Sequence, residues 1–229
     1  MAQQAKAAVT ISGAHHSSFS GHQKDTEPGK KIRGSAGWDN SISYSRGLVT
    51  EPAQEMFRNA RAYNQDPATL KSYREAVKTM LHENVHMLAA EGADHSQAVT
   101  EIDRPGVRPL EEGITELYSQ QKLNDYIDEL GLEEIAPGLK EVDAVESYPK
   151  YRPAAQTFAD SIGRGGGFAA SGRRALARVA ASDAGWAWRV AAAGCGLAVD
   201  RGSPRVPPGR RAACAAAPGS RTRRLNGLP

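Results

Sequence analysis

Two histidines in the middle of the chain have a spacing that suits a shared metal ion. Residues 82–86 read His-Glu-Asn-Val-His, the pattern His-Glu-x-x-His. Residues four apart on a helix lie one turn above each other, so His82 and His86 can direct two imidazole nitrogens at one Zn²⁺. Zinc lowers the pKa of a bound water to about 7, and Glu83 is placed to take its proton during attack on a polarised carbonyl. The chemistry that this pattern predicts is hydrolysis.

A hydrolytic zinc also needs a third protein ligand and one open position. Acidic candidates follow in residues 109–118, Pro-Leu-Glu-Glu-Gly-Ile-Thr-Glu-Leu-Tyr. Glu112 and Glu116 are one helical turn apart, so one can ligate the metal while the other accepts a hydrogen bond from the far nitrogen of a ligating histidine. Glu111 and His95 are rival ligands, and spacing alone does not choose among these four residues.

Two amphipathic helices are predicted to carry these residues. Asp66 followed by Pro67 is typical of a helix start and Gly92 of a stop, which predicts a helix over residues 67–91. Pro109 and Gly131 delimit a second helix over residues 109–130 in the same way. The apolar stripe of the first helix consists of Leu70, Tyr73, Val77, Met80, Leu81 and Leu88. Packing of the two apolar stripes would bring the histidines and glutamates together.

The remaining elements predict an α+β fold that is mainly helical with a small N-terminal sheet. Residues 6–13 and 40–45 contain β-branched and alternating residues that suit short strands. Thr50, as an N-cap before an acid and a proline, predicts a helix to about residue 64, and Arg152-Pro153 begins another.

At the quoted motifs the chain resembles the zincin-like metallopeptidases, specifically the gluzincin arrangement. LHENVHMLA, residues 81–89, is similar to the active-site helix of that family. LEEGITELYS, residues 110–119, is similar to the Asn-Glu-Gly-x-x-Glu stretch of gluzincin aminopeptidases. A metzincin would instead need a histidine six residues after His86, where this chain has Gly92.

The resemblance implies a zincin-like domain that uses Zn²⁺ to hydrolyse a peptide or protein substrate. The implied ligands are His82, His86 and Glu112. Glu83 would be the general base and then the acid to the leaving amine, and Glu116 would orient a ligating histidine. Peptide hydrolysis also needs a donor for the developing oxyanion. The candidate donors are Tyr118, Tyr126, Tyr148 and Tyr151.

The charge of the chain divides near residue 163. Residues 163–229 carry 12 arginines and two aspartates, whereas residues 1–162 have a net charge of −7. Ala, Gly, Arg and Pro make up 46 of the 67 residues of this tail, and such a composition buries little. We expect the tail to be disordered, either as an arm for nucleic acid or another polyanion or as a frame-shifted extension from a GC-rich gene.

The predicted organisation is a flexible segment 1–35, a zincin-like domain 36–162 and the basic tail 163–229. The histidines of the first segment are not expected to be ligands; they are His15, His16 and His22. The chain has two cysteines, no secretory pattern and no apolar run of membrane length, so we expect no membrane partner and, by default, a cytoplasmic location.

Two alternatives to a metallopeptidase belong to other classes. A domain of this family would be expected to continue beyond residue 162, so the chain could be a metal-binding remnant without activity. A polyanion-binding protein acting through the tail is the second alternative, and nucleic acid is expected as a partner only there.

Overall fold

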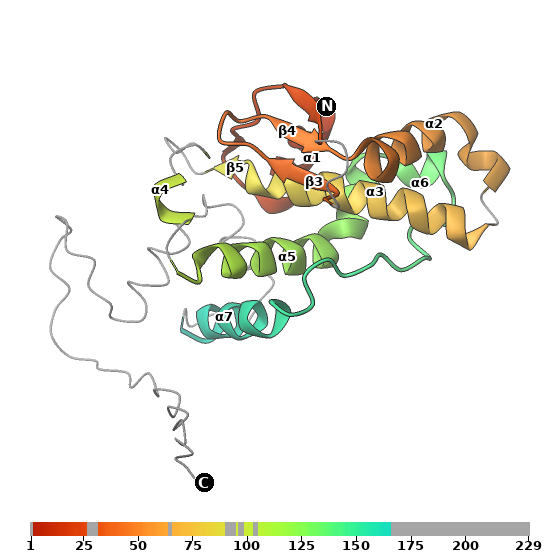
Figure 1. Ribbon diagram of the computed structural model, residues 1–229. Coiled ribbons are helices and arrows are strands. Elements are labelled where there is room, and N and C mark those ends of the chain that lie inside the picture. Colours follow the sequence, from red (N-terminus) through yellow and green to blue (C-terminus); the bar gives the residue numbers. More distant parts are fainter. Residues whose placement is uncertain are drawn as a thin grey trace, which may run out of the picture.

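The computed structural model describes residues 2–26, 32–63, 66–89, 95, 99–102 and 105–165. Within these residues the fold is α+β, mostly helical with a two-stranded and a three-stranded sheet, which confirms the predicted class (Figure 1). The helices are α1 (Ala2–Ser12), the π-helix η1 (Arg46–Thr50), α2 (Glu51–Tyr63), α3 (Pro67–His86), α4 (Val99–Ile102), α5 (Val107–Glu129), α6 (Leu132–Ile135) and α7 (Arg152–Gly165). The strands are β1 (His16–Ser17), β2 (Gln23–Asp25), β3 (Gly34–Ala36), β4 (Ile42–Tyr44) and β5 (Leu88–Ala89).

The predicted tail 163–229 lies outside the described residues, except for the end of α7. No helix in the described part of the chain is long and apolar enough to span a membrane.

Helix α3 is the central element of the fold. The three-stranded sheet and α2 lie along one side of α3, α5 lies along the other, and α7 packs on α5 (Figure 1). Helices α3 and α5 are antiparallel, because His86 contacts Glu111 at one end of their interface and Arg74 contacts Asn124 further along. The two helices predicted to carry the metal ligands are therefore direct neighbours.

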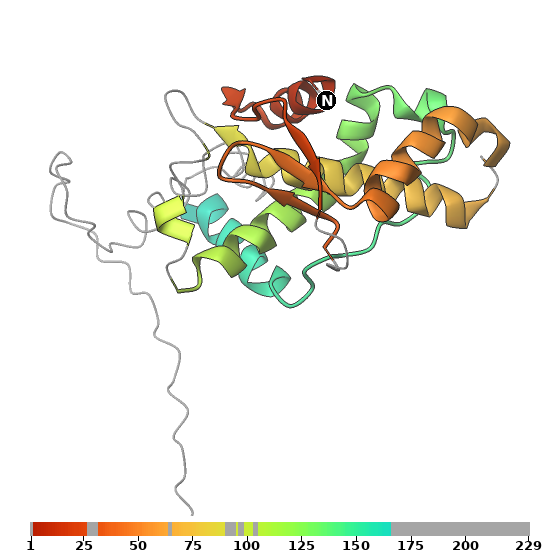
Figure 2. The same ribbon diagram turned by 45° about the horizontal axis from the view of Figure 1, so that its top comes forward.

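The N-terminal segment is helical where the sequence predicted a strand over residues 6–13, so that prediction is wrong. Helix α1 packs against α3 and α5, and Figure 2 shows it on the upper face of the molecule. Its Ala7 and Ala8 are almost fully buried. Alanine has the strongest helix propensity and permits close helix packing, which outweighs the local preference of the β-branched residues at positions 9–11.

Strand β4 confirms the strand predicted within residues 40–45. It is the middle strand of its sheet, parallel to β2 and antiparallel to β3. Ile42 and Tyr44 of β4 are fully buried and pack against Ala76 and Met87. Because β2 and most of β3 precede residue 36, the expectation of a flexible segment 1–35 outside the domain is also wrong.

Helix α2 matches the predicted helix over residues 50–64, but its beginning differs. The π-helix η1 runs directly into α2, so Thr50 lies within continuous helical backbone and is not an N-cap. The backbone N–H groups of Val49 and Thr50 both donate to Ser45 O. The helical segment thus starts at Arg46, earlier than the position of Pro52 suggested.

Helix α3 begins as predicted and ends earlier. The Asp66 side chain accepts a hydrogen bond from the Ala68 N–H at 3.0 Å, as an N-cap does. The predicted end at Gly92 is wrong, because the helix stops at His86 and the next residues form β5, which pairs with β1. This long-range pairing buries Met87 and Leu88 and overrides the local helical pattern.

Helix α5 confirms the helix predicted over residues 109–130. Its buried stripe includes Ile114, Leu117, Leu123, Tyr126 and Ile127. A Cβ atom at Gly113 would lie 3.0 Å from both Cβ and the carbonyl oxygen of Tyr151 and 3.2 Å from Ala155 Cβ. The missing side chain therefore lets the start of α7 approach α5 closely, next to the glutamates.

Candidate metal centre

Helices α3 and α5 bring His82, His86 and Glu112 together. The two Nε2 atoms are 3.2 Å apart, and Glu112 Oε2 lies 3.3 Å from His82 Nε2 and 3.7 Å from His86 Nε2. Among the described residues these three form the group of side chains that could hold a metal ion. The same three residues were predicted as ligands from the sequence.

The spacing of the three donor atoms suits a tetrahedral ion. Ligand atoms at the usual distances of about 2.0–2.2 Å from zinc are separated from each other by roughly 3.3–3.6 Å in a tetrahedral site. The three observed separations, 3.2, 3.3 and 3.7 Å, lie within or next to that range. Catalytic zinc sites typically have three protein ligands of these types and a water, whereas structural zinc sites have four protein ligands.

A carboxylate lies at the far nitrogen of each histidine. His86 Nδ1 is 2.8 Å from Glu111 Oε1, and His82 Nδ1 is 3.3 Å from Glu116 Oε2. Carboxylates at Nδ1 favour the tautomer that carries its proton there, which leaves the two Nε2 lone pairs facing each other. Two imidazole nitrogens and a carboxylate oxygen at this separation could hold a metal ion.

Of the two carboxylates that lie at the histidine Nδ1 atoms, the sequence predicted one and not the other. Glu116 lies at His82, where the sequence placed an orienting residue. Glu111, considered as a rival ligand, instead contacts the far side of His86, a role that sequence reasoning missed. A signal was present, because a metal-binding histidine often donates its other ring N–H to a carboxylate, and Glu111 directly precedes Glu112.

The other histidines of the described residues lie outside this group. His95, the rival third ligand, is buried and stacks on Trp38 with ring centroids 4.6 Å apart. His15 and His16 contact each other edge to face. None of these residues, nor His22, belongs to the group that could hold a metal ion among the described residues.

Glu83, the predicted general base, is buried beside the donor group without being one of its three donors. Its carboxylate lies against strand β3: a Cβ atom at Gly34 would be 2.6 Å from Glu83 Oε1 and 2.7 Å from Cγ. Burial raises the pKa of Glu83, and the His82 and His86 rings partly offset this. Gly34 is a further residue of the site that the sequence did not reveal.

The charges around the two histidines favour the protonated imidazoles and the ionised form of Glu112. Burial alone would lower the pKa of His82, but its contacts with Glu112 and Glu116 raise that pKa above the ordinary value. The pKa of His86 rises further through Glu111 and Glu112, again against burial. Burial acts to raise the pKa of Glu112, but the two histidines hold it well below its ordinary value.

Tyr148 is the tyrosine of the predicted pool that reaches the metal group. Its ring stacks on His82 with centroids 5.7 Å apart and an interplanar angle of 24°. Burial, the charges of Glu112 and Glu83, and a hydrogen bond with Glu112 raise the pKa of its hydroxyl. Tyr151 in turn stacks on Tyr148, with ring centroids 5.8 Å apart.

The other two tyrosines of the pool are structural. The hydroxyls of Tyr118 and Tyr126 donate to the carbonyl oxygens of Ile11 and Gln4 in α1, each at 3.3 Å. Both residues therefore fasten α1 to α5, away from the metal group.

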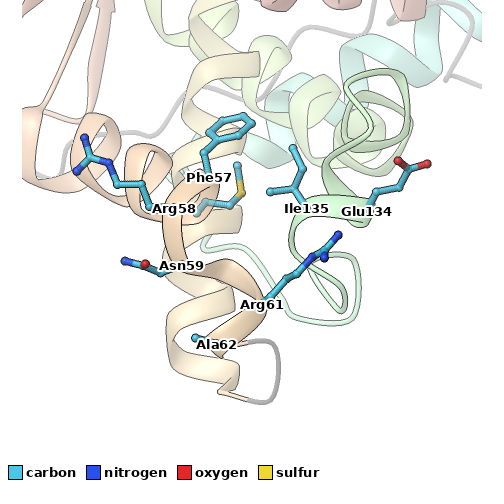
Figure 3. Close-up of a pocket in the computed structure, with 8 residues that line it drawn as sticks. Phe57, Arg58, Asn59, Arg61, Ala62, Glu134 and Ile135 are labelled. Carbon is cyan, nitrogen blue, oxygen red and sulfur yellow. The ribbon is translucent and has the colours of Figure 1, made fainter.

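A separate cavity of about 560 Å³ lies between α2 and α6 (Figure 3). Phe57, Arg61 and Glu134 are among its lining residues, which include no histidine, cysteine or member of the metal group. Among the described residues, the group that could hold a metal ion thus lies at the α3–α5 interface and not in this cavity.

Comparison with known proteins gives no relative for this chain, since no family model, curated protein or solved structure matches it. Function has to be argued from the site.

Proposed function

We propose that the chain is a zinc-dependent metallopeptidase with a zincin-like domain. The observation that supports this most directly is the convergence of His82 Nε2, His86 Nε2 and Glu112 Oε2 within 3.7 Å of each other, with Nδ1 of both histidines facing carboxylates. Three further glutamates, Glu83, Glu111 and Glu116, and one lysine surround these atoms, so with Glu112 the acidic groups outnumber the lysine, an excess of negative charge that a divalent cation offsets.

When bound, a zinc ion supplies Lewis-acid chemistry, lowering the pKa of water and polarising a carbonyl oxygen. Glu83 holds the proton that the water gives up and passes it to the leaving amine. Its burial against Gly34 and β3 fixes the carboxylate and excludes bulk water. The Tyr148 hydroxyl is the best-placed protein donor for the oxyanion, because its ring lies on His82.

The test separates metal binding from chemistry. Purified protein should contain about one zinc per chain and should cleave internal bonds in a mixed peptide library, and a chelator should stop the cleavage. Glu83→Gln should keep the zinc and lose the hydrolysis, whereas Glu55→Gln, at an exposed position on α2, should change neither.

Each contrary outcome points to a different conclusion. A wild-type chain without metal affinity would overturn the metallopeptidase proposal. A chain that holds stoichiometric zinc but cleaves nothing would favour a metal-binding remnant. Full hydrolysis by Glu83→Gln would mean that another group handles the proton.

A further inference from the structure

Lys78 is a buried cation next to the metal group that the proposed mechanism does not use. Its side chain is 3% exposed. Its ammonium lies 2.7 Å from Glu116 Oε1, 2.7 Å from Val145 O and 2.8 Å from Ser147 Oγ. A lysine ammonium has three N–H donors, so these three acceptors satisfy it completely.

Glu116 connects Lys78 to a metal ligand. Its Oε1 accepts from Lys78, from Gln120 Nε2 at 3.0 Å and from the Ser147 N–H at 2.9 Å. Its other oxygen, Oε2, faces His82 Nδ1 at 3.3 Å. One carboxylate thus joins the imidazole on α3, the lysine one turn before it and the backbone of the segment 145–148.

The segment 145–148 has its own contact with the same imidazole. It lies outside the helices and strands, and Val145 and Ser147 hold it through the bonds to Lys78 and Glu116. The next residue, Tyr148, stacks on the face of His82. His82 therefore has the Glu116 carboxylate 3.3 Å from Nδ1 and Tyr148 on its ring face, and Lys78 binds both Glu116 and the segment that carries Tyr148.

We propose that Lys78 is a positioning residue of the metal centre, acting through Glu116 and the segment 145–148 on His82. This inference rests on the proposed metal site. The lysine fixes the Glu116 carboxylate where it can orient His82, and it balances a negative charge that would otherwise be buried beside the ligands. Residues that orient metal ligands in this way typically change metal affinity by about 10- to 100-fold when they are removed.

The first measurement is the zinc affinity of Lys78→Met, by competition with a chromophoric chelator. We expect affinity to fall at least about tenfold, because Glu116 loses the cation that positions it. The visible absorption spectrum of the cobalt-loaded protein should also shift, because it reports the geometry of the ligand atoms. Lys71→Met, at an exposed position on the same helix, is the matched control and should leave both measurements at the wild-type value.

A double-mutant cycle tests whether Lys78 acts through Glu116. Glu116→Gln should weaken zinc binding, and Lys78→Met/Glu116→Gln should be no weaker than Glu116→Gln alone, because the second change has nothing left to act on. Independent, additive losses would overturn the proposed route. The double variant removes both buried charges together, so it is expected to be more stable than Lys78→Met, which leaves the Glu116 charge without its cation.

The outcomes distinguish this inference from the proposed function. A wild-type chain without zinc affinity would defeat the metallopeptidase proposal and this inference with it. A wild-type chain that binds zinc, alongside a folded Lys78→Met variant with unchanged affinity and cobalt spectrum, would overturn the positioning role alone.

Discussion

The two ends of the α3–α5 interface are built in opposite ways. At one end, which we call the ionic end, α3 contributes Lys78, His82 and His86, and α5 contributes Glu111, Glu112 and Glu116. At the other, which we call the apolar end, most residues belong to the main core cluster, and Arg74 binds Asn124 beside them; the cluster residues are Leu70, Tyr73 and Val77 of α3 and Leu123, Tyr126 and Ile127 of α5. The same two helices thus provide a site at one end and packing at the other.

This difference assigns stability and function to different parts of one helix pair. Full burial of a large apolar side chain contributes roughly 1.5–3 kcal/mol, and the apolar end has several such residues. The ionic end places like charges close together in a poorly solvated region, which costs stability until a cation is bound. We infer that the apolar end holds the two helices in place while the ionic end remains ready to bind a metal.

The largest expected contrast is between Leu81 and His82, neighbouring residues of α3 that lie about 100° apart around the helix axis. Leu81 is fully buried in the core, so Leu81→Ala should cost about 2–5 kcal/mol of unfolding free energy and leave zinc stoichiometry unchanged. His82→Ala should abolish zinc binding with a smaller effect on the metal-free protein, because it removes a donor atom. Denaturant unfolding and metal analysis measure the two effects. If His82→Ala still bound one zinc per chain, the proposed contrast between Leu81 and His82 would be wrong.

A second contrast lies between the metal-ligand group, which should set zinc affinity, and Glu83, the proposed general base, which should set the rate of hydrolysis. Gly34→Ala would place a Cβ atom 2.6 Å from Glu83 Oε1, so the carboxylate has to move. We expect peptide hydrolysis to fall by about 10²-fold or more while zinc affinity stays near the wild-type value. Ser35→Ala, at an exposed position on the same strand, is the control. Undiminished hydrolysis by Gly34→Ala would show that the position of this carboxylate is not critical.

The sequence predicted the candidate site best where the positions of its residues follow from helical periodicity. The i, i+4 spacing of His82 and His86, and of Glu112 and Glu116, places each pair on one face of a helix, and the apolar stripes then bring the faces together. The Asp66 N-cap could also be predicted, because its hydrogen bond joins two residues that are close in the chain.

Contacts between segments distant in the chain were not predictable in this way. The end of α3 depends on the pairing of β5 with β1, about 70 residues earlier. The roles of Lys78 and Tyr148 depend on an irregular segment whose path no periodic pattern specifies. Helix α1 was predicted as a strand because its β-branched residues were judged locally, whereas its burial is set by α3 and α5.

The two carboxylates that lie at the histidine Nδ1 atoms, those of Glu116 and Glu111, should contribute differently to zinc affinity at the ionic end. The Glu116 side chain is 3% exposed and has partners on Lys78, Gln120 and Ser147, whereas that of Glu111 is 16% exposed and contacts His86. We expect Glu116→Gln to weaken zinc affinity by about 10- to 100-fold and Glu111→Gln by less, because the more exposed pair is screened by solvent. Chelator competition on both variants measures the difference. A larger loss of zinc affinity in Glu111→Gln than in Glu116→Gln would show that Glu111 is the more important of the two carboxylates.

The smallest effect is expected at the start of α3, beyond the apolar end. Asp66 caps the helix through the Ala68 N–H and accepts a hydrogen bond from Thr69, and these bonds hold its pKa below the ordinary value. A carboxyl whose pKa is lowered by folding adds stability above its unfolded pKa and loses that contribution as the pH falls through its folded pKa. Asp66→Ala should therefore lower the Tm of the metal-free protein slightly at neutral pH, and the difference from wild type should shrink in acid.

Asp66→Asn keeps the capping oxygen and serves as the control, with a Tm nearer to wild type. Zinc affinity measured at neutral pH should be the same in all three proteins, because Asp66 lies four turns from the nearest ligand on α3. A loss of zinc affinity in Asp66→Ala would show that the ionic end depends on the stability of the far end of the helix, and the separation of packing from site would fail.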